Sequence, residues 1–178
     1  MSKLAVARPR QDEADPYYQP YISAVAGEDI AAQLRDQIDQ LDRLLGPLSD
    51  AEARRRYAEG KWSIKEVLGH LLDTERIFAY RMLRISRGDP TPLPGFDENA
   101  YVPAGRFDER PLPELLEEFR AMRLSTAAMV AGTATEWWER RGVASEKPIS
   151  ARALAYIIVG HVTHHIGVLN NRYGLRPR

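Results

Sequence analysis

Three of the four histidines of this chain fall in one apolar stretch, residues 150–173, which reads SARALAYIIVGHVTHHIGVLNNRY. His161 and His165 are one helical turn apart, so in a helix both rings lie on one face and can converge on one ion. His164 points about 100° away from His165. The pair continues a stripe of apolar residues at helical spacing, formed by Leu154, Ile158 and Leu169. The spacing indicates a metal site in the middle of a core-facing helix surface.

A third imidazole comes from His70, which lies far upstream in another predicted helix. Two buried neutral imidazoles that face each other leave ring nitrogens without partners, whereas a metal ion satisfies both. We therefore predict His70, His161 and His165 as metal ligands. The alternative is that they are core residues bonded to backbone carbonyls, because HxxxH is a short pattern that chance often supplies.

Two carboxylates on the helix of His70 are candidates for orienting that ring. Asp73, three residues further on, is expected to accept the N–H of the other ring nitrogen. Glu66 and Thr74 are weaker candidates for the same role. A carboxylate on a helix is often merely solvated, and the sequence assigns no catalytic residue.

Four amphipathic segments must position these side chains. The first runs from Asp29 to a stop at Gly46, and the second opens at Ser63 with a capping box to Glu66. The third begins at Pro113, and the fourth occupies the histidine-bearing stretch. With no convincing strand, the pattern predicts an all-α four-helix bundle.

The remaining segments are less regular. Residues 1–14 are expected to form a loose tail, and residues 15–178 a single domain. The tyrosine- and proline-rich residues 16–22 suit an extended strap across the bundle, or a dimer contact. Residues 88–113 show no periodicity and predict a long loop between the second and third helices. Its residues 96–101 suit a wall over a pocket, although a packed surface loop without a ligand is the commoner case.

The composition of the chain limits the kinds of partner and metal ligand that we expect. The 178 residues include 25 basic and 25 acidic side chains without long blocks of one sign, so a nucleic-acid partner is not expected. The chain has no cysteine, so any metal must take nitrogen and oxygen ligands. No window approaches a membrane span and no signal segment is evident, so we expect a cytoplasmic protein without membrane contact.

Three motifs together resemble those of the DinB/YfiT-like superfamily. They are GKWSIKEVLGHLLDTE from Gly60, GDPTPLPGFDE from Gly88 and GHVTHH from Gly160, and the similarity extends over nearly the whole chain. The resemblance implies a four-helix bundle, often dimeric, with one divalent metal ion held by His70, His161 and His165.

The resemblance also implies a choice of functions. Similar proteins include metal-dependent hydrolase candidates, transferases that join bacillithiol or mycothiol to electrophiles, and a mycothiol-dependent maleylpyruvate isomerase. We expect Zn²⁺ or Ni²⁺ and a small-molecule substrate, with a low-molecular-weight thiol as co-substrate of an S-transferase. A hydrolase that uses metal-activated water, and a non-catalytic metal-binding stress-response protein, are the alternatives.

Overall fold

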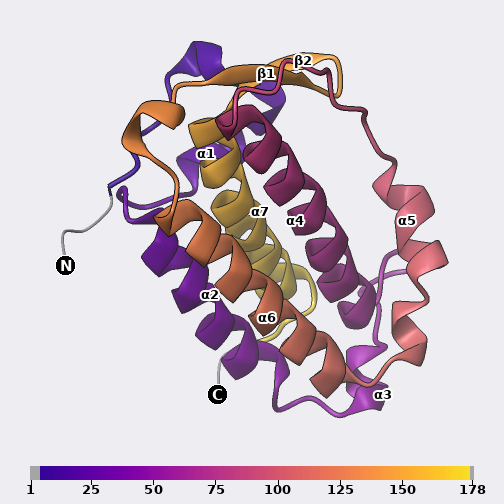
Figure 1. The fold of residues 1–178 in the computed structure, drawn as a ribbon. Helices are drawn as coiled ribbons and strands as arrows, with labels where there is room; N and C mark the ends of the chain where they lie inside the picture. Colours follow the sequence, from indigo (N-terminus) through magenta and orange to yellow (C-terminus); the bar gives the residue numbers. More distant parts are fainter. Residues whose placement is uncertain (1–4, 177–178) are drawn as a thin grey trace.

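The computed structural model describes residues 5–176, in which four long helices pack side by side (Figure 1). Their bounds are α2 Ile30–Leu45, α4 Ile64–Ser86, α6 Leu112–Ala131 and α7 Ala151–Arg172. Both α6 and α7 pack against α2 and α4, which closes the bundle. The predicted four-helix bundle is confirmed. None of the helices within residues 5–176 is long and apolar enough to cross a membrane.

Three of the four helices begin where the sequence places a polar cap. The side chains of Asp29, Ser63 and Ser150 each accept a hydrogen bond from a backbone N–H in the first helical turn. Glu66 accepts a bond from the Ser63 backbone N–H at 2.7 Å, which completes the predicted capping box. These caps fix the start of α4 and α7, and with it the height of the histidines along the bundle.

The tyrosine-rich segment is helical, and is not the extended strap that its prolines suggest. A 3₁₀ turn over Pro16–Tyr18 leads into α1, Gln19–Ser23. The prolines of both lie in the first turn, where a missing backbone N–H leaves no bond unmade. α1 packs against α7 so closely that a Cβ atom on Gly160 would lie 1.9 Å from the carbonyl oxygen of Tyr21.

A two-stranded antiparallel hairpin precedes α7, although the sequence shows no convincing strand. β1, Arg141–Ala144, pairs with β2, Lys147–Ser150, and the hairpin lies across one end of the bundle (Figure 1). The turn residues Ser145 and Glu146 have φ of 51° and 64°. A two-residue turn of this kind normally takes Asn or Gly, so the sequence carried no hairpin signal.

The long segment between α4 and α6 is partly ordered into helix. It contains α5, Glu98–Gly105, and a 3₁₀ turn over Phe107–Glu109. α5 packs along the outside of α4, and Leu93 joins the hairpin through a backbone bond to Val143 at 2.9 Å (Figure 1). The expectation of one irregular loop is corrected: Pro103 inside α5 and its weak periodicity hid the helix.

The N-terminal residues pack against the bundle. Residues 1–4 of the expected loose tail lie outside the described residues, but Val6 is fully buried and Glu13 is 1% exposed. Glu13 forms an ion pair with Arg152 on α7 and accepts a hydrogen bond from Ser150 at 2.8 Å. The packed domain therefore extends N-terminal to the expected boundary at residue 15.

The core is divided halfway along the bundle. One apolar cluster lies towards the hairpin, and a second lies towards the short helix α3, Asp50–Ala53. Between them the bundle helices contribute several buried polar side chains. We take one from each helix and call these four the mid-bundle polar layer: Gln37, Glu75, Arg123 and His161.

Candidate metal centre

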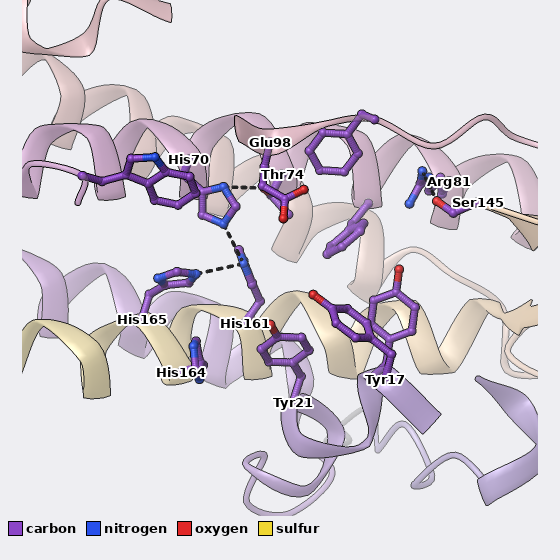
Figure 2. Close-up of a pocket in the computed structure, with 14 residues that line it drawn as sticks. Tyr17, Tyr21, His70, Thr74, Arg81, Glu98, Ser145, His161, His164 and His165 are labelled. Atoms are coloured by element: carbon purple, nitrogen blue, oxygen red, sulfur yellow. Dashed lines mark hydrogen bonds between the residues drawn. The ribbon is translucent and has the colours of Figure 1, made fainter. Parts of the chain in front are cut away.

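The three predicted ligands meet at the interface of α4 and α7 (Figure 2). Nε2 of His161 lies 3.0 Å from Nε2 of His70 and 3.1 Å from Nε2 of His165. One ring nitrogen from each of the three histidines lies within 4.8 Å of the others. His70 and His161 are each 7% exposed, and His165 is half-buried. The structure thus brings together side chains that are 91 residues apart in the chain.

The contacts among these nitrogens suit a cation better than hydrogen bonds. A ring nitrogen carries either one proton or one lone pair, so Nε2 of His161 can form only one good bond to its two nitrogen neighbours. A metal ion instead accepts a lone pair from each ring. Metal–nitrogen bonds of about 2.0–2.1 Å place neighbouring nitrogens roughly 3.0–3.4 Å apart, and the two distances from His161 Nε2 lie in this range. The three side chains therefore fit a divalent metal ion.

Burial keeps the three imidazoles neutral. It lowers the pKa of His70 to about 4 and the pKa of His165 to about 3, and the neighbouring histidines add a smaller effect of the same sign. Burial also holds the pKa of His161 well below its usual value, with the charges of His165 and His70 next in importance. At neutral pH each ring consequently has a free lone pair for a metal ion.

The outer nitrogen of His70 faces Thr74 and not Asp73. Nδ1 of His70 lies 3.4 Å from Oγ1 of Thr74, which is four residues on and continues the same helix face. Asp73 instead lies 3.9 Å from Arg76, on the outer side of α4. The expectation that Asp73 orients His70 is therefore corrected.

Glu66 is also engaged away from His70. Its carboxylate accepts from the Ser63 backbone and forms an ion pair with Arg56. His164 is exposed and lies outside the cluster, as the helical spacing predicts, with its ring 5.4 Å from that of Tyr21. Among the described residues, the buried Nδ1 of His165 has no hydrogen-bond partner.

A pocket of about 290 Å³ opens in front of the histidines (Figure 2). This volume is at the lower end of the range for small-molecule sites. Its wall combines α4 and α7 with α1, the α4–α6 segment and the hairpin turn. Six aromatic side chains line it, namely Tyr17, Tyr18, Tyr21, Trp62, Phe78 and Phe96.

Two charged residues in this wall carry no clear signal in the sequence. In the sequence, Glu98 is noted only as part of the segment 96–101 that suits a pocket wall. Arg81 cannot be distinguished from the other charged residues of its helix. The structure places both in the pocket lining, together with Ser145 of the hairpin turn.

A family model described as the DinB superfamily matches residues 10–169, almost the whole chain. The chain belongs to the DinB superfamily. This DinB chain is 27% identical over 71 residues to a protein of Oceanobacillus iheyensis that is named as a candidate metal-dependent hydrolase. The match covers 39% of this chain and spans only 40% of that relative's length.

Two solved structures are similar in fold. YfiT from Bacillus subtilis, described as a probable metal-dependent hydrolase with an unusual four-helix bundle topology, superposes with a TM-score of 0.71 at 16% identity, over 96% of this chain and 95% of that chain. The mycothiol-dependent maleylpyruvate isomerase superposes with a TM-score of 0.64 at 15% identity, over 78% of this chain and 58% of that chain. At these identities the likeness establishes the fold of the DinB chain, while the activities belong to those proteins.

Proposed function

We propose that this protein is a divalent-metal-dependent enzyme that transfers a low-molecular-weight thiol to an electrophilic small molecule. The observation that carries the proposal is the convergence of three neutral imidazoles on the wall of an open pocket. Within residues 5–176 the cluster contains no fourth histidine, cysteine or carboxylate ligand. A site with three protein ligands and an open side is built for chemistry, whereas structural sites are closed by a fourth ligand.

A bound Zn²⁺ or Ni²⁺ ion would lower the pKa of a thiol or a water molecule that enters the pocket, which makes either a better nucleophile. The protein's own side chains do the rest. His70, His161 and His165 hold the ion, while the aromatic wall limits access of bulk water and aligns the electrophile. In the transfer, a sulfur–carbon bond forms, the thiol proton is released, and the electron pair of the broken bond departs with the leaving group.

Hydrolysis is the second candidate, and Glu98 is the observation that favours it. A hydrolase needs a carboxylate that can take a proton from water, and Asp73 and Glu66 are turned away from the histidines. Glu98 comes from α5 and lines the same pocket. The open pocket supports either enzyme over a non-catalytic metal-binding protein. The homodimer inferred from the resemblance stays a prediction.

Metal content of the untagged protein is the first test. We expect close to one divalent ion per chain in the wild type and almost none in His161→Ala. His164→Ala is the matched control, because this neighbouring histidine lies outside the cluster and should leave metal content unchanged. A wild type that stays empty after incubation with zinc and nickel would refute the metalloenzyme proposal.

Turnover by zinc-loaded protein separates the two reactions. Thiol transfer predicts product only when a thiol and an electrophile are both present, and Glu98→Gln should retain much of that rate. Hydrolysis predicts ester or amide cleavage without thiol, and a loss of about 10²–10⁴-fold in Glu98→Gln if this carboxylate is the general base. Thiol-independent cleavage by the wild type would reject the transferase.

A further inference from the structure

Arg81 is a buried cation without an anionic partner in the described part of the chain. Its side chain belongs to the pocket lining, yet the residue is only 2% exposed. No carboxylate among residues 5–176 lies within ion-pair distance of it, whereas buried Arg123 and Arg152 are paired with Glu75 and Glu13. Buried arginines are almost always paired, because an uncompensated charge loses its hydration. Burial accordingly lowers the pKa of Arg81.

The guanidinium of Arg81 is held firmly by neutral groups, among them the hydroxyl of Tyr18, whose pKa is raised by burial. Nη2 donates to the carbonyl oxygen of Pro94 at 2.6 Å and to Oγ of Ser145 at 3.0 Å. Its carbon also lies 5.7 Å and 5.8 Å from the ring centroids of Phe78 and Phe96, within range of a cation–π contact. These contacts orient the group and leave its full positive charge and some of its five N–H donors for another partner.

The pocket has two chemically distinct ends (Figure 2). The three histidines form one end, and Arg81 with Ser145 forms the other, with aromatic rings between them. Among the described residues that line the pocket, Glu98 is the only acidic one, and it lies on the histidine side of those rings. An elongated ligand that meets the metal at one end therefore meets a positive charge at the other.

We propose that Arg81 binds the carboxylate of an organic acid whose reactive group faces His70, His161 and His165. This inference rests on the proposed function and adds the substrate class: a small acid with an aromatic or unsaturated body. A single guanidinium in a small pocket matches one carboxylate, whereas a phosphate dianion usually calls for several cationic groups. The acid is either the electrophile or the thiol, since both reactants enter the same pocket.

Matched neutral and anionic probes test the inference without a reaction. Benzoate, phenylacetate and 3-phenylpropanoate are titrated calorimetrically against their primary amides, with chelator-treated protein and with zinc-loaded protein. In the metal-free wild type at least one acid should bind about tenfold or more tightly than its amide. Equal binding of every acid and its amide would overturn the proposal, and this comparison needs no variant.

Variants locate the preference. Arg81→Gln keeps a donor for Pro94 and Ser145 but removes the charge, so it should lose the tenfold preference for the acid and retain its metal. Arg84→Gln, on the same helix and outside the pocket lining, is the matched control and should keep the preference. A preference that persists in metal-free Arg81→Gln would assign the carboxylate to another group of the protein, and a preference that appears only with zinc would assign it to the metal. Either result would refute the role of Arg81.

The two proposals can fail separately. If the protein binds no metal, the metal-free titration still decides whether Arg81 selects carboxylates. If metal binds and turnover occurs, the reactant that carries the carboxylate is the one whose KM rises about tenfold in Arg81→Gln. An unchanged KM for both reactants contradicts the inference while leaving the metal site intact.

Discussion

His161 Nε2 lies within 3.1 Å of two other ring nitrogens, and no arrangement of protons pairs both contacts. His161 is also the ligand whose Nε2 contacts both of the other two rings, so its removal should abolish the site. The orientation of each histidine ring also depends on the hydrogen-bond partner of its outer nitrogen, the one that does not face the metal.

Replacement of Thr74 by valine tests that control. The change keeps the side-chain volume and removes the oxygen that lies 3.4 Å from Nδ1 of His70. Outer partners of metal-bound histidines typically contribute 10–100-fold in affinity, and this contact is long, so we expect a loss of about tenfold or less. Zinc affinity measured by competition with a chelator provides the readout.

The matched control for Thr74→Val is Thr133→Val. Thr133 is also buried, and its hydroxyl donates to the backbone carbonyl of Met129 at 2.8 Å, but it lies just beyond the C-terminus of α6. It should leave zinc affinity unchanged. Equal zinc affinity in both variants and the wild type would show that Thr74 does not orient His70.

Among the elements, α1 depends on a single glycine of α7. The helix pair can approach this closely only because Gly160 has no side chain, and Tyr21 then brings its ring to 5.5 Å from that of His161. The glycine thus sets the position of one wall of the pocket.

Gly160→Ala should destabilise the protein by about 1–3 kcal/mol, because the new Cβ meets backbone atoms of α1 that cannot rotate away. We expect α1 to shift outward and the near-ultraviolet signal of its tyrosines to change. Gly167→Ala on the same helix is the control. Nothing lies within 4 Å of the Cβ added at this position. Because alanine has the higher helix propensity, the free energy of unfolding of Gly167→Ala should be unchanged or up to about 1 kcal/mol higher. Equal urea midpoints for the two variants would contradict the close packing.

The elements that carry strong local signals could be predicted from the sequence. Capping residues such as Ser63 and Ser150 and the period of the apolar stripes defined the bundle helices, and the one-turn spacing of His161 and His165 placed them on one face. The elements that line the rest of the pocket lacked such signals. The hairpin turn uses Ser145 and Glu146 where the usual residues are Asn and Gly, and α5 contains a proline.

For the molecule as a whole, the stability of the fold depends on a buried pair of opposite charges in the mid-bundle polar layer. Glu75 and Arg123 are 3% and 0% exposed, and Nε of Arg123 lies 3.1 Å from a carboxylate oxygen of Glu75 without the alignment of a good hydrogen bond. Burial raises the pKa of Glu75 and lowers the pKa of Arg123. Each charge is tolerated only because the other is present.

Arg123→Met should therefore cost about 3–5 kcal/mol, because it leaves a buried carboxylate without a counter-charge. The double variant with Glu75→Met should recover most of that loss. Urea unfolding of metal-free protein gives both values without interference from metal binding. If the double variant is as unstable as the single one, lost packing and not the unpaired charge is the cause.

Such buried charges also mark where reasoning from sequence alone stops. Glu75, Arg81 and Arg123 have the same residue types as the many solvated charges of this chain, and their local patterns do not separate them. Only the packed helices reveal that Glu75 and Arg123 form a pair and that Arg81 has no carboxylate partner within residues 5–176. Apart from the histidines, the functional residues of the pocket can therefore be recognised only from the tertiary structure.

The pocket wall is built partly from bundle helices and partly from the segments that connect or precede them. The histidines stand on α4 and α7, whereas much of the opposite wall comes from α1, the α4–α6 segment and the hairpin turn. Mutations in those connecting segments can change which molecule is admitted without disturbing the histidines. Members of one lineage can then diverge in substrate while they inherit the same three ligands, so a shared histidine triad is a poor guide to shared metabolism.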